Sequence, residues 1–279
     1  MDFSIITPSL NMLPYLRLCA ASIEDQSGVT KEHIVIDGGS TDGTVEWLRQ
    51  NSAIKHVIGK DDGMYDALNK GLALAKGEIL AYLNCDEQYL PDTLRAIKTF
   101  FSDTRHADLV FGDFLVIRPD GSLIAFRKAF RPRWQYIFAS YLYTFTCTMF
   151  FRREIVDQGF RFRPNLRLSG DAEFVIRLLR GGFRADYLKQ FLSVFTITGD
   201  NLSSKGQTST EIRRTFYREA PVWVRAARPL INLVRLAEKT FHDSYFQRFP
   251  LEYSIYTPVD LTRRRDFSVT RASFLWKNR

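Results

Sequence analysis

The residues best suited to chemistry in this chain are Asn84, Asp86 and Glu87, which directly follow an apolar run. That run, residues 79–83, is expected to form a buried strand. Carboxylates at the end of a buried strand are costly to desolvate without a partner, but this edge of an open α/β sheet is also where ligands bind. Mg²⁺ and Mn²⁺ take carboxylate oxygens and leave other positions to substrate phosphates. The stretch therefore indicates either a metal site or an acidic turn that caps a helix beginning near Pro91.

A second candidate is Asp37, which ends another β-rich run and precedes Gly38 and Gly39. The glycines let the backbone turn sharply and approach a ligand, and a carboxylate there can accept a hydrogen bond from a ribose hydroxyl or a base N–H. The segment taken alone favours a simpler reading, a turn with a helix cap at Thr41 or Asp42. The chain contains neither G-x-G-x-x-G nor G-x-x-x-x-G-K-[ST], which weakens dinucleotide and P-loop interpretations.

A third candidate is the acidic start of an apolar helical segment, with Asp171 and Glu173 just before residues 174–179. Acids in the first turn interact favourably with the helix dipole and cap the helix, and the residues alone favour this structural role. The same dipole stabilises the carboxylate of Asp171, which keeps it ionised but weakens it as a base.

Strand-like and helix-like segments alternate through the part of the chain that holds these candidates. Strands are expected at residues 3–7, 33–37, 55–59 and 79–83, and helices at 15–25, 44–49 and 66–75. The first strand is expected to stop at Pro8, which cannot donate to a ladder. This alternation predicts an α/β fold with a mostly parallel sheet covered on both faces.

The composition is that of a globular protein, with 45% hydrophobic and 25% charged residues among 279. The length fits one large or two small domains with a substantial core. Cys19, Cys85 and Cys147 are odd in number and lack motif spacing, so a reducing compartment is expected. The first residues lack the basic region and cleavage site of a signal peptide, and we expect a cytoplasmic protein.

Residues 134–151 form a stretch of 18 residues without a formal charge, flanked by arginines. Its length alone would suit a transmembrane helix. Gln135, Ser140 and three threonines interrupt it, and its second half is rich in β-formers. A helix followed by a buried strand is therefore expected in place of a membrane span.

The formal charge of +8 is concentrated near the C-terminus, where residues 211–279 hold 14 Lys/Arg and 7 Asp/Glu. Residues 221–241 have helical patterning, with a basic stripe formed by Arg225, Arg228, Arg235 and Lys239. The stripe is either the solvated face of a helix packed on the core or a surface that lies on anionic lipid. Residues 263–265 and the aromatic end at 274–276 agree with the second reading.

Four ordered motifs together resemble the family 2 glycosyltransferases, over residues 3–204. They are IITPSLN from Ile5, DGGSTDGT from Asp37, KDDGMYDALNKG from Lys60 and LNCDE from Leu83. The closest likeness is to enzymes of bacterial exopolysaccharide and O-antigen assembly. The resemblance implies the GT-A fold, a nucleotide-diphosphate sugar donor, with UDP the favoured nucleotide, and Mn²⁺ or Mg²⁺ as cofactor.

The resemblance also implies roles for individual residues. The nucleotide-sugar side is expected to contain Thr7, Pro8, Ser9, Asp37, Gly38, Asp61, Asn84 and Cys85. Asp86 matches the metal-binding aspartate of the family's Asp-x-Asp, whose first position is Asn84 here, so a weaker metal site is implied. Asp171 falls on the catalytic base and is preceded by Gly170 where relatives have an acid. Glu173 and Trp134 fall on the acceptor side, and residues 198–204 match a loop that folds over the substrates.

The expected function is inverting, metal-assisted hexosyl transfer to an acceptor hydroxyl in polysaccharide or glycolipid assembly. The expected acceptor is a glycan or a polyprenyl-diphosphate-linked sugar, with an anionic membrane surface as a further partner and no nucleic acid. This places the protein in the cytoplasm or at the inner face of the membrane, with a GT-A domain at residues 1–208 and a basic, mainly helical extension at 209–279. The alternatives are an inactive nucleotide-sugar-binding protein or a sugar nucleotidyltransferase, whose Gly-rich basic loop is missing at residues 9–11.

Overall fold

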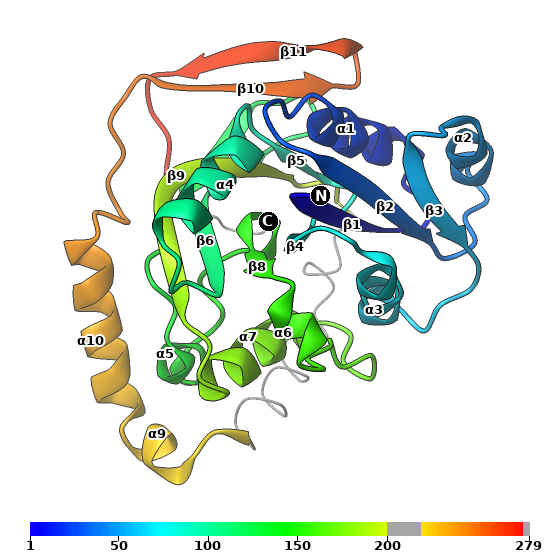
Figure 1. The fold of residues 1–279 in the computed structure, drawn as a ribbon. Coiled ribbons are helices and arrows are strands. Elements are labelled where there is room, and N and C mark those ends of the chain that lie inside the picture. The colour runs from blue at the N-terminus through cyan, green and yellow to red at the C-terminus, as the bar shows by residue number, and fades with distance from the viewer. Residues whose placement is uncertain (200–218, 276–279) are drawn as a thin grey trace.

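The computed structural model describes residues 1–199 and 219–275. Its main feature is a curled sheet with the strand order β3-β2-β1-β4-β8-β6-β9-β5, to which β7 adds beside β6 (Figure 1). The helices lie on both faces of this sheet, while α10 and a separate hairpin lie at the periphery.

The elements follow the chain in an order close to that expected. The strands of the sheet are β1 (Phe3–Ser9), β2 (Lys31–Asp37), β3 (Ile54–Ile58), β4 (Ile79–Tyr82), β5 (Glu87–Tyr89), β6 (Leu109–Ile117), β7 (Leu123–Arg127), β8 (Phe150–Arg152) and β9 (Ala185–Thr196). The helices between them are α1 (Leu13–Glu24), α2 (Thr44–Gln50), α3 (Met64–Leu74), α4 (Thr93–Asp103), α5 (Trp134–Ala139), the 3₁₀ turn η1 (Thr146–Thr148), α6 (Glu154–Asp157) and α7 (Gly170–Arg180). The C-terminal part adds α9 (Val222–Ala226), α10 (Arg228–Phe241), β10 (Leu251–Thr257) and β11 (Asp260–Val269).

The first four strands are parallel and adjacent. β1 pairs with β2 on one side and with β4 on the other, and β2 pairs with β3. Their carboxyl ends therefore meet at one edge of the sheet, as the alternating pattern predicted. The other half is mixed, because β6 and β9 are parallel while β5, β7 and β8 pair antiparallel with their neighbours.

Pro8 does not end the first strand, contrary to the expectation from its missing N–H. β1 continues to Ser9, and Pro8 lies opposite Ile36 of β2. The carbonyl of Ile6 accepts a hydrogen bond from the Leu83 N–H just beyond β4. Since successive residues of a strand bond to alternate neighbours, Pro8 also faces the β4 side. β4 has ended there, so the strand requires no N–H from Pro8.

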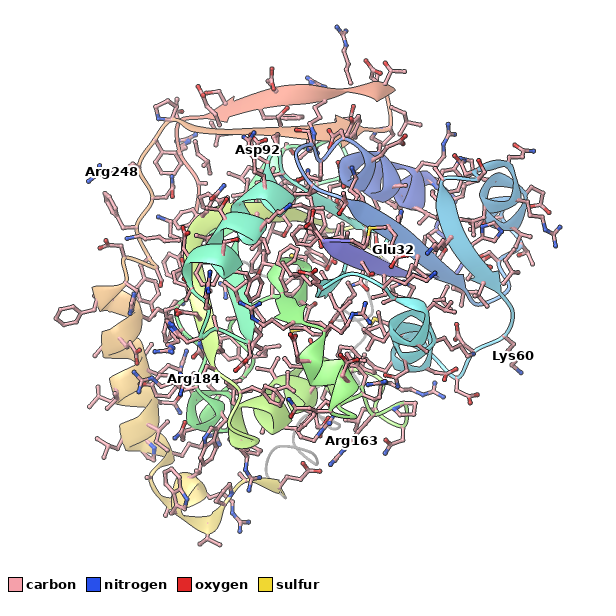
Figure 2. All side chains as sticks on the ribbon, viewed as in Figure 1. Glu32, Lys60, Asp92, Arg163, Arg184 and Arg248 are labelled. Carbon is pink, nitrogen blue, oxygen red and sulfur yellow. The ribbon has the colours of Figure 1, made fainter. Side chains whose placement is uncertain are left out.

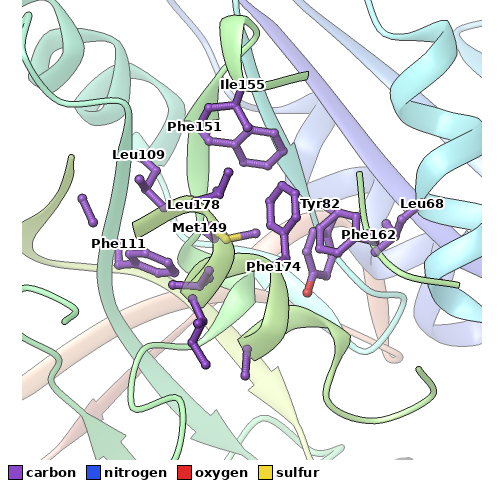
Figure 3. Close-up of a cluster of buried hydrophobic side chains, with 14 of the residues drawn as sticks. Leu68, Tyr82, Leu109, Phe111, Met149, Phe151, Ile155, Phe162, Phe174 and Leu178 are labelled. Atoms are coloured by element: carbon purple, nitrogen blue, oxygen red, sulfur yellow. The ribbon is translucent and has the colours of Figure 1, made fainter. Parts of the chain in front are cut away.

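The sheet is covered by apolar clusters on both faces, as predicted. One cluster includes Leu68 of α3, Tyr82 of β4 and Phe174 of α7 (Figure 3). The other lies on the opposite face, beneath α1 and α4, and includes Cys19 and Leu94. These two clusters hold α3 and α7 on one face and α1 and α4 on the other.

Residues 134–151 form α5, η1 and β8, which confirms a helix followed by a buried strand, although the strand is only three residues long. In the ranges that the structure describes, no helix combines the length and the apolar character needed to cross a bilayer.

The C-terminal extension is helical only in its first part. The alternating residues Leu251, Tyr253 and Ile255 belong to a β10–β11 hairpin that the expectation of a mainly helical extension missed. The hairpin is attached to the end of α1 through Asp25, which accepts hydrogen bonds from Tyr256 Oη at 3.0 Å and Arg264 Nε at 2.5 Å. Arg264 is therefore committed to protein contacts and is not a lipid ligand. The boundary at residue 208 lies outside the described residues.

The helical pattern of residues 221–241 is confirmed, and Val224 and Ile231 contact the core as expected, but most of α10 turns the opposite side inward. The helix is interrupted between α9 and α10, where Pro229 occupies the first turn of α10. Arg235 and Lys239 of the basic stripe are only 7% and 8% exposed, whereas Leu230 and Leu233 are 62% and 65% exposed. The basic side of α10 faces the protein, and its apolar side faces solvent.

A buried carboxyl group on β6 gives the fold a pH-dependent stability. Asp113 accepts hydrogen bonds at Oδ1 from Tyr187 Oη at 2.5 Å and from the Ala129 N–H at 3.0 Å, and burial raises its pKa to about 7. An acid whose pKa is raised by folding stabilises the protein below its unfolded pKa, and this contribution is lost as the pH rises through the folded pKa. We expect the unfolding free energy to fall between pH 4 and pH 7 by at most roughly 4 kcal/mol from this group.

Asp113→Asn should remove the Asp113 share of this dependence, because the amide oxygen keeps an acceptor for both donors and cannot ionise. The measurement is the denaturant midpoint at several pH values for both proteins. An unchanged slope in the variant would show that other groups cause the dependence.

Candidate functional site

The edge formed by the ends of β1–β4 holds most of the predicted nucleotide-side residues. The Gly38 N–H donates to the Ser9 carbonyl at 2.9 Å, and the Gly59 N–H donates to the Asp37 carbonyl at 2.9 Å, so the three loops are joined. The Asp61 carboxylate lies against Gly38, where an added Cβ would come within 3.1 Å of its oxygen. A side chain at position 38 would therefore crowd the Asp61 carboxylate, which would have to shift slightly.

Asp37 organises its own loop. Its side chain is fully buried, and Oδ1 accepts hydrogen bonds from the N–H groups of Gly39 at 3.0 Å and Ser40 at 2.8 Å. Oδ2 accepts from the Ser40 hydroxyl at 2.6 Å. Both carboxylate oxygens are thus engaged within the turn, and contact with a nucleotide would add to this structural role.

Two of the predicted residues, Thr7 and Cys85, lie behind the surface of the edge. The Thr7 hydroxyl is fully buried and lies 2.9 Å from Nε2 of His33, so its side chain supports β1 and does not line a pocket. The Cys85 thiol donates to the Pro8 carbonyl at 3.3 Å and packs with Leu16 and other apolar residues. Burial raises the pKa of the Cys85 thiol, which keeps it protonated. A ligand could reach these positions only through their backbones.

Two buried oxygen atoms at the edge have no hydrogen-bond partner among the described residues, Ser9 Oγ and Asn84 Oδ1. Asn84 is held by Glu87, which accepts from its backbone N–H at 2.7 Å and from its side-chain amide at 3.2 Å. The amide oxygen is thereby left as an available acceptor. Buried polar atoms without partners are rare and are satisfied by water, an ion or a ligand, so these two atoms offer hydrogen-bonding positions at this edge.

The charges near Asn84 are concentrated in a small volume. Glu87 is fully buried, and burial raises its pKa to about 8, with the carboxylates of Asp86 and then Asp171 adding to the shift. Asp86 and Asp171, which are far apart in sequence, therefore both raise the pKa of Glu87. Asp86 is half-buried, and its own carbonyl accepts from the Thr196 N–H of β9 at 2.9 Å.

The side chains present fit a divalent cation held partly by substrate. In the described part of the chain, no group of three or more His, Cys, Asp or Glu residues could enclose a metal. Asp86 offers one carboxylate and Asn84 an unpaired amide oxygen. This oxygen-only set suits Mg²⁺ or Mn²⁺ that takes its other ligands from phosphates and water.

Asp171 is positioned by Tyr65 of α3. The Tyr65 hydroxyl accepts from the Asp171 N–H at 3.1 Å and lies 3.4 Å from Asp171 Oδ1, while the Ala172 N–H donates to the same oxygen at 2.7 Å. Tyr65 is almost completely buried, and its ring stacks on Phe162 at 5.7 Å. The carboxylate thus remains half-exposed on a rigid support.

The segment before α7 is fixed to α3 as well. Asn69 forms two hydrogen bonds with the backbone of Phe162, at 2.8 Å to its carbonyl and 2.9 Å from its N–H. Phe162 also stacks on Phe174 of α7 at 4.2 Å. These contacts join the motif that contains Tyr65 to the helix that contains Asp171. Tyr65 and Asn69 belong to the KDDGMYDALNKG motif that carries part of the family resemblance. Their contacts with the α7 region become apparent only from the structure.

Gly170 is explained by the close approach of α7 to Tyr65. A Cβ at position 170 would lie 2.6 Å from the Tyr65 ring, so no side chain fits without displacing that ring.

We expect Gly170→Ala to cost about 1–3 kcal/mol of unfolding free energy and to lower turnover by roughly tenfold or more through misplacement of Asp171. Tyr65→Phe, which keeps the ring, should lower turnover with a smaller stability loss. Turnover and melting temperature of both variants provide the check, and full activity in both would contradict this role for Tyr65.

The side chains of Glu173 and Trp134 make contacts with arginines, away from the edge formed by β1–β4. Glu173 is 4% exposed and pairs with Arg163 at 3.0 Å and Arg177 at 2.9 Å. It lines a cavity of about 450 Å³ on the α7 surface, together with Phe138, Phe160, Arg163, Ile176, Arg177, Arg180, Gly181 and Glu219. The Arg180 guanidinium lies 5.7 Å above the Trp134 ring, at the border of this cavity. The predicted loop at 198–204 lies outside the described residues from position 200 onward.

The sequence was compared with known protein families and curated proteins. Residues 4–160 match the model of glycosyl transferase family 2. A PGL/p-HBAD biosynthesis glycosyltransferase of Mycobacterium tuberculosis is 38% identical over 120 residues, which cover 41% of this chain and 47% of the relative. The match thus spans about half of that relative's length. The putative teichuronic acid biosynthesis glycosyltransferase TuaG of Bacillus subtilis is 28% identical over 231 residues, covering 77% of this chain and 87% of TuaG.

The fold also resembles solved structures. S. aureus TarS 1–349 superposes with a TM-score of 0.61 at 18% identity, covering 92% of this chain and 96% of that one. A complex of the same protein with UDP-GlcNAc gives a TM-score of 0.60 at 15% identity, with coverages of 97% and 100%. The mannosyltransferase PcManGT from Pyrobaculum calidifontis, in complex with GDP-Man and Mn²⁺, gives 0.57 at 17% identity, with coverages of 86% and 75%. These likenesses confirm the expected GT-A fold.

Proposed function

Because this chain belongs to glycosyl transferase family 2, we propose that it is an inverting glycosyltransferase that uses a nucleotide-diphosphate sugar. The observation that carries this proposal is the placement of Asp171. Its Tyr65-supported carboxylate acts on the same buried Glu87 as Asp86, which follows β4 at the edge of the sheet. This shared effect on the Glu87 pKa supports a site in which Asp171 and Asp86 face the same bound substrates.

We propose that the donor nucleotide lies over the ends of β1–β3, beside Asp37, Gly38 and Asp61. The Ser9 hydroxyl would donate to or accept from its polar groups, and Asn84 Oδ1 would act as an acceptor, since neither has a partner among the described residues. Mn²⁺ or Mg²⁺, held by Asp86 and Asn84 when bound, would supply Lewis-acid neutralisation of the diphosphate leaving group.

Asp171 then takes the proton from an acceptor hydroxyl as that oxygen attacks the anomeric carbon. Tyr65 keeps the carboxylate in place through its contacts with the Asp171 N–H and Oδ1. A single in-line displacement needs one base and inverts the anomeric configuration, whereas retention in glycosidases uses a second, nucleophilic carboxylate. Holding both substrates in one cleft supplies proximity.

The acceptor is proposed to approach along α7, where Glu173 and Trp134 lie. The cavity there carries three arginines and two glutamates. Arg163 and Arg177 pair with glutamates here, so Arg180 is the arginine best placed for phosphate oxygens, which this residue type suits. It supports a polyprenyl-diphosphate-linked acceptor. Such an acceptor would place the enzyme in the cytoplasm at the inner face of the membrane.

The test is a hydrolysis screen that needs no acceptor. Purified protein with Mn²⁺ is incubated with UDP- and GDP-linked sugars, the two donor classes bound by the fold neighbours, and release of the nucleoside diphosphate is measured. Slow release from one donor, with UDP-linked sugars favoured, is expected. Donor binding without hydrolysis or transfer would favour an inactive nucleotide-sugar-binding protein, and incorporation of a nucleoside triphosphate would favour a nucleotidyltransferase.

A further inference from the structure

The surface of α9 and α10 carries an apolar face that the described part of the chain leaves uncovered. Val222 and Trp223 of α9 are 72% and 52% exposed, and Leu230, Leu233 and Phe241 of α10 are 62%, 65% and 91% exposed. Ala226, Val234, Leu236 and Ala237 are also exposed. Residues 230, 233, 234, 237 and 241 have the spacing of one side of a helix, so they form a continuous stripe, called here the apolar face.

The opposite side of α10 is polar and is attached to the protein. Arg228 Nε and Asn232 Nδ2 both donate to the carbonyl of Ala139 at the end of α5, at 2.8 and 3.2 Å. Glu238 accepts from the Tyr136 hydroxyl at 2.6 Å and from Arg133 Nη2 at 3.1 Å.

Two basic side chains add aromatic contacts on this side. The Arg235 guanidinium lies 5.4 Å from the Tyr141 ring, and Lys239 Nζ lies 4.3 Å from the Tyr245 ring. Turning the apolar face inward would break all of these contacts and bury the charges. Among the described residues, these contacts hold α10 with its apolar face outward.

Charge at the rim of the apolar face determines what could cover it. Arg225 and Arg248 are exposed near it, and Arg248 lies at the outer edge of the molecule beyond the end of α10 (Figure 2). The one exposed acid between residues 222 and 250, Asp243, pairs with Lys189 at 3.5 Å. Two copies of this face would bring like charges together, whereas anionic headgroups would complement them.

The apolar face also begins beside the arginine-lined cavity. Trp223 packs against Trp134 with ring centroids 5.7 Å apart, and Arg180 of the cavity lies above the same Trp134 ring. In Figure 1, α5 lies between α10 and α7, and α10 forms the edge opposite α2 and β3. A surface seated on α9 and α10 would thus meet the cavity border.

We propose that the apolar face of α9 and α10 inserts into the interface of an anionic lipid bilayer, with the rim arginines at the headgroups. A helix with Leu, Trp and Phe on one face and basic residues beside it lies in the plane of such an interface. This differs from the expectation of a basic stripe on lipid, because Arg235 and Lys239 face the protein. The proposal holds for the surface whether or not the chain transfers sugar.

The test is co-sedimentation of the whole protein with vesicles of phosphatidylcholine containing about 30% phosphatidylglycerol, a content chosen to give an anionic surface. The test variant is Leu230→Gln with Leu233→Gln, two exposed positions where folding should be unaffected. The matched control is Leu74→Gln with Val259→Gln, which are 45% and 90% exposed and belong to other surfaces. Melting temperature and gel-filtration mass are recorded for all three proteins.

Wild type and control should bind, and the test variant should bind about tenfold more weakly or worse. Raising the salt should weaken wild-type binding without abolishing it, since only the arginine contribution is screened. The proposal is overturned if wild type ignores these vesicles, or if the test variant binds as tightly as wild type. It is also overturned if wild type is a dimer that the test variant converts to a monomer, because a second copy then covers the face.

Discussion

Asp171→Asn should lower sugar transfer by roughly 10²-fold or more, as expected when a general base is lost. The asparagine oxygen can accept the same hydrogen bonds that Asp171 Oδ1 receives from the Ala172 N–H and shares with Tyr65. The fold should therefore be preserved, with a melting temperature close to that of wild type. Donor affinity should also change little, because the removed charge acts on the acceptor proton. Single-turnover transfer, donor titration and thermal unfolding together provide the measurement.

Glu173→Gln is the matched control on the same turn of α7. Its carboxylate pairs with Arg163 and Arg177, and removing one partner of a buried pair destabilises a protein. This variant should lose stability and retain most of its turnover per folded molecule. If Asp171→Asn keeps its turnover while Glu173→Gln loses it, the base is Glu173.

Asp86→Asn should abolish the effect of Mn²⁺ on donor binding. Asp86 is the one carboxylate of the proposed cation site, and Asn84 contributes no charge. We expect wild type to bind UDP at least about tenfold more tightly with Mn²⁺ than without it, and the variant to show no difference. Thermal shift reports this directly, since a ligand that binds only the native state raises the midpoint.

Asp62→Asn is the control for a general loss of negative charge, because Asp62 is exposed in the neighbouring loop. It should retain the Mn²⁺ effect in full. Metal-stimulated activity that persists in Asp86→Asn would assign the cation to other ligands, with Glu87 the nearest carboxylate in sequence.

The sequence predicts the positions of those site residues that lie at or just after the ends of strands. Asp37 ends β2, while Asp61 and Asn84 follow β3 and β4 of the same parallel half of the sheet, so an alternating β/α pattern was sufficient to place them at one edge. It could not tell which side chains at that edge point outward. Thr7 belongs to a matching motif, yet strand alternation turns it toward His33.

The support of Asp171 depends on contacts between distant segments. Tyr65 and Gly170 are 105 positions apart, and their steric dependence follows only from the packing of α3 against α7. A glycine where relatives have an acid was visible in the sequence, but its reason was not. Similarly, periodicity identifies two faces of α10 without indicating which one is buried. The usual assumption that the apolar side faces inward fails because Ala139, Tyr136 and Arg133 offer polar partners.

The most direct test of the proposed active site is a crystal structure of the chain with UDP and Mn²⁺, using anomalous scattering to locate the metal. We predict a manganese peak bound by Asp86 and both phosphates of UDP, with the nucleoside over the ends of β1–β3 and Asp171 facing the open side of the diphosphate. A nucleotide bound away from this edge, or a manganese peak without Asp86 among its ligands, would contradict the proposal.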